Sequence, residues 1–352
     1  MVWIHIVGGG VAGLSLASEL SKHKILPGSV VVSDPNFNAR DDRTYSFWSD
    51  RDHSNFLPGT SQYSKWVVSS ENGSVTQTGK NWHYYRISGR AFYEKCKKVI
   101  ERHPQCFLNR DTLVSKPSAK YVFDSRPPST DRFRAYQSFV GIEINCEHNF
   151  AKDVALLMTN MRAEDSGLYF EYMLPITNTS LLIESTYFGA MPGNIKNLEK
   201  NSLEWIKNNN LTGKIIRKEK AHIPMGLRPS TNDDWGIPIG ARGGMTRASS
   251  GYGFMNMRSW AKITAKTLTA GKPITKYRPP LLETWMDLQL IKIIQEHPQH
   301  LPKIFLDIAQ KTKGDDFASF LTKARPLNAL QVITSAPAKP FLKSIMQMIK
   351  EK

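Results

Sequence analysis

Three glycines close to the start of the chain have the spacing of a phosphate-binding turn. An apolar run over residues 4–7 leads into Gly8, Gly10 and Gly13, which form the pattern G-x-G-x-x-G. Gly8 permits a tight turn, Gly10 leaves room for a pyrophosphate, and Gly13 lets the following helix pack closely on a sheet. This pattern between a predicted strand and a predicted helix indicates a dinucleotide-binding β-α-β unit. The alternative is a glycine turn with a purely structural role.

Asp34 and the first turn of that helix complete the unit. Val11 and Ala12 begin the helix, whose unpaired N–H groups and partial positive charge favour a bound phosphate. Asp34 ends the next apolar run, residues 30–32, about twenty residues past the last glycine. An acidic side chain at this place accepts a hydrogen bond from a ribose 2′-hydroxyl. The sequence therefore predicts a dinucleotide whose adenosine has a free 2′-hydroxyl.

A second candidate is a glutamate within an apolar β-rich run. Strand alternation places Leu182, Glu184, Thr186 and Phe188 on one face. A carboxyl group among apolar neighbours has a raised pKa and stays protonated near neutrality, which suits a general acid. Periodicity alone favours the alternative, a glutamate on the wet face of an exposed strand.

The elements that must position these residues follow from the hydrophobic pattern. Helical spacing predicts helices over residues 89–103 and 254–269, and a short buried strand covers residues 121–124. Four β-rich runs at meander spacing predict an antiparallel sheet inserted between two halves of the nucleotide domain; they cover residues 137–144, 155–161, 168–174 and 180–188. The chain then returns through a second glycine-rich loop, residues 243–252, and is mainly helical beyond residue 279.

Composition bounds the class of protein. With 352 residues, 40% of them hydrophobic, the chain can bury a sizeable core and is expected to form about two intertwined domains. Cys96, Cys106 and Cys146 are odd in number and lack metal-ligand spacing, so we expect buried free thiols in a reducing compartment. No His/Cys/Asp cluster in the sequence predicts a metal site. The apolar start is used by a strand without a cleavage site, so no signal peptide is expected.

The chain is strongly basic, with a net charge of +16 from 47 Lys and Arg against 31 Asp and Glu. Nucleic acid, an anionic membrane face and acidic substrates are all compatible with this charge. Residues 317–352 carry six basic residues and one acidic residue among many apolar ones, which is typical of a basic amphipathic surface helix. The alternative is a helical cap that faces the core. No nucleic-acid motif is found, so nucleic acid is not the expected partner.

Several motifs together resemble a known family. The glycine turn, Asp34, the β insertion and the late glycine-rich loop resemble flavoproteins of the glutathione-reductase type. Within that group the details are similar to the lycopene cyclase family. The matching pieces stand in the family's order over residues 1 to about 260 and are Arg43-Thr44-Tyr45-Ser46-Phe47-Trp48, Val122-Phe123-Asp124-Ser125-Arg126-Pro127, Leu174-Pro175 with Leu181–Phe188, Glu219 with Ile223-Pro224-Met225, and Gly243-Gly244-Met245-Thr246 with Ser250-Gly251-Tyr252.

This resemblance implies a fold and a domain plan. The expected class is α/β: a glutathione-reductase-type FAD-binding Rossmann fold with an inserted antiparallel β-sheet domain for substrate and C-terminal helices. The expected FAD-binding domain comprises residues 1–45, 85–132 and 225–275. Residues 46–84 and 133–224 would form the substrate-binding β domain, and residues 276–352 a helical region that faces a membrane.

The resemblance also implies an activity: a flavin-dependent isomerase that forms β-ionone rings on lycopene without net oxidation or reduction. Reduced FAD would be the active cofactor, with NADPH as the external reductant. The substrate would be lycopene or a related linear carotenoid, taken from a membrane, by a cytoplasmic protein bound peripherally to the inner membrane face. The ring type (β, γ or ε) and the number of ends cyclised stay open.

Residues are assigned to this chemistry by position. Glu184 falls on the family's essential acid, which would protonate a terminal alkene and start ring closure. The implied FAD contacts are Gly8, Gly10, Val11, Ala12, Gly13, Asp34 and Arg90 for adenosine, pyrophosphate and ribityl groups, and Gly240, Gly243, Gly244 and Met245 for the ring. Arg43 would bind phosphate or pair with an acid such as Asp124, which would fix the loop beneath the cofactor. Candidates for contact with substrate are Phe47, Trp48, Ser250, Gly251 and Tyr252.

The chain departs from the family at two places. Arg247-Ala248 replaces a common His-Pro in the late loop, and Ala221-His222 stands where a glycine often precedes Ile-Pro. An alternative activity on the same fold is an FAD-dependent monooxygenase or prenyl reductase acting on a hydrophobic substrate. A further alternative is a noncatalytic carotenoid- or lipid-binding protein.

Overall fold

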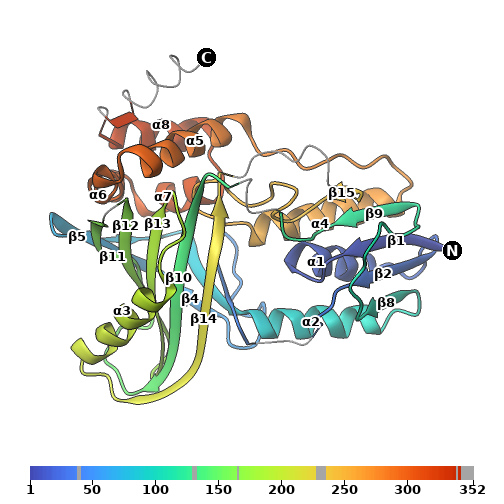
Figure 1. Cartoon of the computed structure of the whole chain (residues 1–352), viewed down its shortest axis with the longest axis horizontal. Coiled ribbons are helices and arrows are strands. Elements are labelled where there is room, and N and C mark those ends of the chain that lie inside the picture. The colour runs from blue at the N-terminus through green and yellow to red at the C-terminus, as the bar shows by residue number, and fades with distance from the viewer. Residues whose placement is uncertain (38–40, 129–132, 165, 227–234, 338–339, 342–352) are drawn as a thin grey trace.

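The computed structural model describes residues 1–37, 41–128, 133–164, 166–226, 235–337 and 340–341. The first lobe contains a five-stranded parallel sheet in the order β15-β9-β1-β2-β8. Helices α1 (Val11–Leu20), α2 (Gly89–Glu101) and α4 (Phe254–Thr269) pack beside it (Figure 1). The strands are β1 (Val2–Val7), β2 (Ser29–Ser33), β8 (Cys106–Asn109), β9 (Tyr121–Asp124) and β15 (Ile237–Pro238).

The second lobe is built on a seven-stranded sheet in the order β14-β10-β13-β12-β11-β5-β6. All of its strand pairs are antiparallel except that between β11 and β5. The strands are β5 (Lys65–Ser70), β6 (Gly73–Thr78), β10 (Ala135–Cys146), β11 (Val154–Glu164), β12 (Gly167–Thr177), β13 (Ser180–Gly189) and β14 (Gly213–Met225). A small sheet has the order β3 (Thr44–Ser49), β7 (His83–Ser88) and β4 (Ser61–Tyr63), and all three strands lie between β2 and β8 in sequence.

Helices cover both faces of the large sheet. Helix α3 (Ile195–Asn208) packs on β10 and β13 through Leu198 and Ile206. The C-terminal helices gather near the other face (Figure 1). They are α5 (Leu281–Glu296), the 3₁₀ turn η2 (Pro298–His300), α6 (Leu301–Lys311), α7 (Gly314–Thr322) and α8 (Pro326–Ser335). In the described part of the chain, no helix is both long and apolar enough to span a membrane.

The predicted α/β class, with a parallel sheet and an inserted antiparallel sheet, is confirmed. Strand β9 and helix α4 have the predicted bounds, and the four β-rich runs become strands β10 to β13. They do not form a simple meander, because β10 pairs with β13 and β14 and not with β11. The β-rich interpretation also missed α3, whose buried residues recur at helical spacing. All three cysteines are buried and free, as expected.

Candidate active site

The first glycine turn lies against the end of strand β2. Gly8 has a φ of 104°, a conformation that favours glycine. The N–H of Gly9 donates a hydrogen bond to Asp34 Oδ2 at 2.7 Å. A Cβ on Gly13 would lie 2.1 Å from the carbonyl oxygen of Gly8, whereas a Cβ on Gly10 would meet nothing within 4 Å. Gly13 is therefore required for close packing, and Gly10 faces open space.

That open space is a pocket of about 200 Å³ lined by Gly9, Gly10, Leu14, Asp34, Asn36, Phe37, Asp42, Arg43, Tyr93, Lys97 and Leu108. Arg43 lines it and pairs with Asp42 at 2.9 Å. Arg90, expected to contact the cofactor, is instead exposed and pairs with Glu94 along α2 at 2.9 Å. Lys97, two turns further along the same helix, supplies a cation to the pocket wall, and sequence reasoning missed it.

Asp124 takes a supporting position at the end of β9. Its side chain is fully buried and accepts hydrogen bonds from Arg126, the shorter at 2.7 Å. Burial opposes ionisation, but Arg126 and Arg242 together hold the pKa of Asp124 below its usual value. The partners of this acid are thus Arg126 and Arg242, and Arg43 pairs elsewhere.

The late glycine-rich loop returns to the first turn. Gly240 and Gly244 have φ values of 64° and 70°. A Cβ on Gly240 would lie 3.3 Å from the Cβ of Ala12, which places this loop against the start of α1. Gly244, like Gly10, has open space where a side chain would stand, while Met245 is fully buried. Gly10 and Gly244 therefore each leave open space where a side chain would stand.

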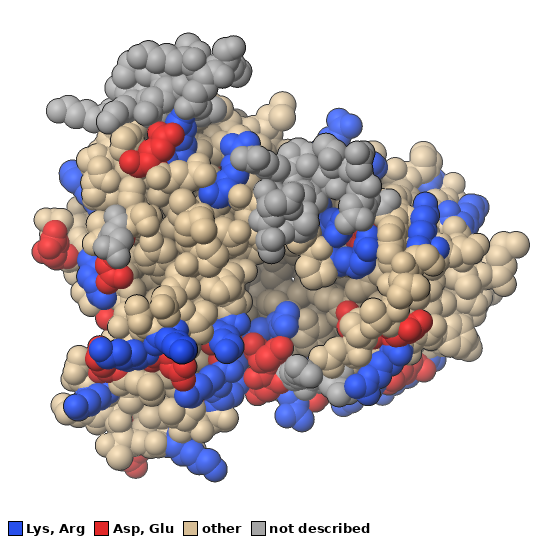
Figure 2. Space-filling view, in the orientation of Figure 1, with Lys and Arg blue, Asp and Glu red and all other residues tan. Residues whose placement is uncertain are grey.

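A cavity of about 720 Å³ adjoins the nucleotide pocket and shares Asp42 and Arg43 with it. Its walls are largely apolar and include Phe139, Leu157, Phe170, Phe188, Leu290 and Phe305. The space-filling view shows the surface hollowed between the two lobes (Figure 2). Helices α5 to α8 form one side of this cavity, and the faces of β10 and β13 away from α3 form another. Such volume and lining are typical of sites for hydrophobic small molecules.

Glu184 faces this cavity with Thr186 and Phe188, as strand alternation predicted. Burial, the charge of Glu219 and a hydrogen bond to Glu219 raise the pKa of Glu184 well above its usual value. Glu219 itself accepts hydrogen bonds from Arg217 Nη1 at 2.6 Å and from Thr44 Oγ1 at 3.2 Å. Both Glu184 and Glu219 line the cavity, and these surroundings favour the protonated form of Glu184.

A cluster of hydroxyl groups lies near Glu184. Tyr172 contacts Ser46 Oγ at 3.1 Å and Tyr84 at 3.2 Å, and Tyr84 contacts Tyr252 at 3.2 Å, oxygen to oxygen. Burial raises the pKa of all three tyrosines, and the nearby Glu184 carboxyl adds to this for Tyr172 and Tyr252. Three neutral phenols with connected hydroxyl groups thus line the cavity.

The aromatic residues of β3 divide between cavity and core. Tyr45 and Ser46 line the cavity with Ser250, Gly251 and Tyr252. Phe47 stacks on Phe254 at 5.3 Å between ring centroids, and Trp48 packs against Trp66 at 4.5 Å. Both Phe47 and Trp48 are 3% exposed and are not among the lining residues, so packing accounts for them.

Arg247, one of the departures from the family pattern, joins the late loop to the C-terminal helices. Its Nε lies 3.1 Å from Asp287 Oδ1 on α5, and its guanidinium covers the ring of Phe320 on α7 at 4.5 Å. It also donates to the carbonyl oxygen of Phe320. This residue closes one side of the cavity as a packed and fully paired cation.

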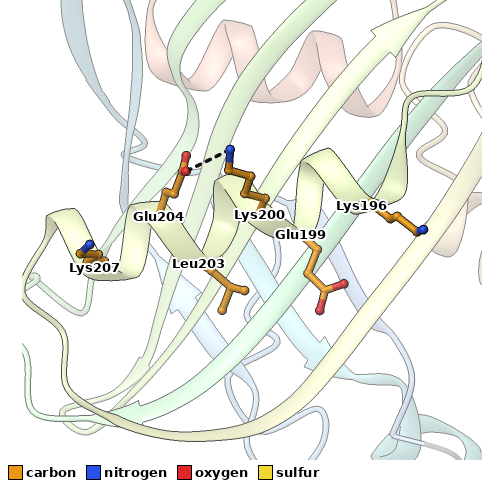
Figure 3. A pocket seen from close by; sticks show the side chains of 6 residues that line it. All are labelled: Lys196, Glu199, Lys200, Leu203, Glu204 and Lys207. Atoms are coloured by element: carbon orange, nitrogen blue, oxygen red, sulfur yellow. Dashed lines mark ion pairs between the residues drawn. The ribbon is translucent and has the colours of Figure 1, made fainter.

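A further depression lies on the outer side of α3 and is lined by Lys196, Glu199, Lys200, Leu203, Glu204 and Lys207 (Figure 3). All of these side chains come from one helix, and Lys200 pairs with Glu204 at 3.6 Å. Helix α3 covers the sheet face opposite Glu184. This surface is a solvated helix face and is separate from the cavity.

The family model for lycopene cyclase protein matches residues 4–280. The chain belongs to the lycopene cyclase family. A lycopene β-cyclase from a Paracoccus species is 26% identical over 154 residues, which are 41% of this chain and 40% of that protein. The match thus spans about two fifths of the length of this relative.

Solved structures share the fold over nearly the whole chain. A geranylgeranyl bacteriochlorophyll reductase-like protein from Thermoplasma acidophilum is 11% identical with a TM-score of 0.61, covering 97% of this chain and 98% of that chain. A flavin-dependent brominase is 11% identical with a TM-score of 0.59, covering 99% of each chain. At such identity these proteins indicate a common fold and no common reaction.

Proposed function

We propose that this protein is a lycopene β-cyclase that closes β-ionone rings by acid catalysis, giving γ- or β-carotene. The observation that carries the proposal is the position of Glu184 on the wall of an apolar cavity beside the pocket at Gly10, where burial and Glu219 raise the pKa of its carboxyl group. A hydrocarbon such as lycopene offers no polar group to activate, so the reaction must begin by proton transfer to an alkene. Glu184 is placed and protonated for that step.

The residues present suit FAD. Gly10 and Gly244 leave open space for a close approach of pyrophosphate and ring, and Asp34, Arg43 and Lys97 line the pocket expected for the adenosine and phosphates. Asp34 already accepts hydrogen bonds from the N–H groups of Gly9 and Asn36, both at 2.7 Å, and has remaining acceptor capacity for a ribose hydroxyl. Bound in the reduced form, with NADPH as external reductant, the flavin would supply negative charge beside the cavity.

The protein's own residues account for the sequence of proton transfers. Glu184 gives its proton to the terminal alkene, the resulting tertiary cation is attacked by the neighbouring double bond, and loss of a different proton leaves the ring alkene. The faces of Tyr172 and Tyr252 lie near Glu184 and stabilise a cation by about 0.5–2 kcal/mol each. Apolar side chains from α5 to α8 exclude water that would capture the cation. The product is isomeric with the substrate.

A membrane is the proposed source of the substrate, and the protein would bind it peripherally from the cytoplasmic side. Helix α8 supports this because it is apolar on two faces. Val332 lines the cavity, whereas Leu327, Leu330 and Ile333 are exposed on the outside at helical spacing. Lys323 and Arg325 precede this outer stripe and suit an anionic surface. A water-insoluble polyene would pass from lipid to cavity across this helix.

Expression in cells that accumulate lycopene tests the proposal, with pigments separated by chromatography and mass detection. We expect a cyclic product of unchanged mass, and its loss in Glu184→Gln while flavin stays bound. Glu171→Gln is the matched control, because burial also raises the pKa of Glu171 but this residue lies on β12 outside the cavity lining. Ring formation that persists in Glu184→Gln would refute the assignment of the acid.

The second candidate is an FAD-dependent monooxygenase or prenyl reductase. The fold is compatible with this activity, because it is shared with a reductase-like protein and with an oxygenase, the latter 12% identical with a TM-score of 0.55, covering 91% of this chain and 95% of that chain. This activity would consume NAD(P)H in step with product and change its mass. The same chromatographic experiment therefore separates the two candidates.

A further inference from the structure

Glu184 and Glu219 meet above a glycine. In the register of the large sheet, Gly141 on β10 pairs with Glu184 on β13 and with Glu219 on β14. The three residues thus form one row across three strands, so the two glutamates stand two strand spacings apart, about 9–10 Å. A Cβ on Gly141 would lie 2.8 Å from Glu219 Cγ and 3.1 Å from Glu184 Cγ. The missing side chain is what lets the two glutamates lean together and form their hydrogen bond.

The charges around this pair determine where its proton resides. Among the described residues, Arg217 pairs with Glu219 at 2.6 Å and with Glu143 at 2.7 Å, and Arg86 pairs with Glu143 at 3.3 Å. Three carboxyl groups thus accompany two guanidinium groups in a poorly hydrated region. The cluster is neutral when one carboxyl group is protonated, and burial strongly favours neutrality. Glu184 is the carboxyl group that neither arginine contacts in the described structure.

Other charged groups nearby do not change the charge balance of the three carboxyl groups and two guanidinium groups. Asp41 lies 3.9 Å from Arg217 and is 42% exposed, so solvent screens it. Lys218 and Lys220 flank Glu219 on β14, but both are exposed, and Lys218 pairs with Glu199 on α3. The hydroxyl groups of Tyr172 and Tyr252, which face Glu184 from β12 and the late loop, are neutral.

We propose that Glu219, which is fixed by Arg217 and Thr44 on the cavity wall, is a positioning residue that accepts a hydrogen bond from Glu184 and so keeps the single shared proton on Glu184. This inference rests on the proposed cyclisation and deepens it. When Glu184 gives its proton to the alkene, two adjacent carboxylates remain. Their repulsion makes Glu184 a strong base, which takes the proton released by the ring cation and restores the starting pair. One proton leaves and one returns, so the cycle balances without a proton from solvent.

Infrared titration of the purified holoprotein tests the pair without any cyclase assay. The protonated Glu184 should give a carboxylic C=O band, isolated as the difference between wild type and Glu184→Gln because burial also raises the pKa of Glu171 and Glu283. In Glu219→Gln this band should disappear at a pH at least about one unit lower than in the wild type, because the repelling charge is gone. Gly141→Ala, which inserts a methyl group between the glutamates, should shift it in the same direction.

Activity measurements complete the test. With lycopene as substrate, the alkaline limb of the plot of kcat against pH should move to lower pH by at least about one unit in Glu219→Gln. This shift corresponds to an about tenfold lower kcat at a fixed pH on that limb, and KM should be unchanged. Glu171→Gln should leave both profile and KM as in the wild type. The proposed pairing of Glu184 with Glu219 is overturned if neither the carboxylic C=O band nor the pH profile of kcat shifts in Glu219→Gln, even if rings form. Absence of rings in a wild type that shows the predicted band overturns the cyclase proposal and leaves the pair intact.

Discussion

Replacing Arg247 with methionine should destabilise the protein by about 4 kcal/mol. Arg247 and Asp287 are each 3% exposed at the side chain and form an ion pair at 3.1 Å. Removing one partner of a buried pair costs about 3–5 kcal/mol, because the remaining charge is left uncompensated. Ser249 Oγ still donates to Asp287 at 2.7 Å, which keeps the loss near the lower limit. The lost bond to the Phe320 carbonyl adds about 1 kcal/mol.

A double-mutant cycle measures this pair. Urea unfolding of wild type, Arg247→Met, Asp287→Leu and the double variant, at one fixed flavin concentration, gives the four free energies of unfolding. The double variant replaces the pair with apolar side chains of similar size, so we expect a coupling energy of at least about 2 kcal/mol. Lys65→Met is the control, because Lys65 and Asp153 are 3.2 Å apart but 45% and 49% exposed. Its cost should stay below about 1 kcal/mol.

Two results would refute this reasoning. The first is a loss in Arg247→Met no larger than that in Lys65→Met, which would mean that water reaches the Arg247–Asp287 pair. The second is strict additivity in the cycle, which would mean that the two side chains do not stabilise each other. Either result would remove the argument that Arg247 fixes α5 and α7 against the late loop.

Three further predictions concern cofactor, pH and membrane. Gly10→Ala should keep the thermal stability of the flavin-free protein but weaken flavin binding in a fluorescence titration, whereas Gly13→Ala should lower stability itself, because its Cβ would lie 2.1 Å from a carbonyl oxygen. Because the pKa of Glu184 is raised in the folded state, folding takes up a proton at pH values above the ordinary glutamate pKa, and the free energy of unfolding falls as the pH rises. Glu184→Gln removes this penalty and should therefore raise Tm at alkaline pH. At acidic pH the Tm values of the variant and the wild type should differ little. Leu327→Ser with Leu330→Ser should reduce co-sedimentation with anionic vesicles severalfold while the melting temperature stays constant, because both residues are exposed.

Much of the nucleotide pocket could be predicted because its determinants are local. The turn at Gly8, the space at Gly10 and the acid at Asp34 lie within one β-α-β unit, and the chain itself sets their spacing. The side-chain period of two in a strand likewise predicted the face on which Glu184 lies. Arg90 illustrates the limit of local reasoning, because the rotation of α2 against the sheet decides that Lys97 and not Arg90 lines the pocket.

The residues around the acid required the tertiary structure. Glu219 and Gly141 were not predicted as partners of Glu184, because β-strand register brings together residues that lie 35 and 43 positions away from it in sequence, respectively. A glycine within the apolar run of β10 was the available signal, since glycine inside a strand often marks a close approach of other groups. In β3 both faces are aromatic, so periodicity could not tell that Tyr45 lines the cavity while Trp48 enters the core.

The sequence by itself indicated the family and most of the order of elements, since these depend on residue types at short spacings. Strand alternation placed Glu184 on one face with Thr186 and Phe188, but only the tertiary structure showed that this face lines a cavity. The direction of the pKa shift of Glu184 was decided by tertiary structure. Burial raises the pKa of any carboxyl group, and the pKa of Glu184 rises further because pairing of β10 with β13 and β14 brings Glu219 beside it. Arg86 and Arg217 form their ion pairs with other carboxyl groups. Charges act through distance in space, and that distance is set by the fold.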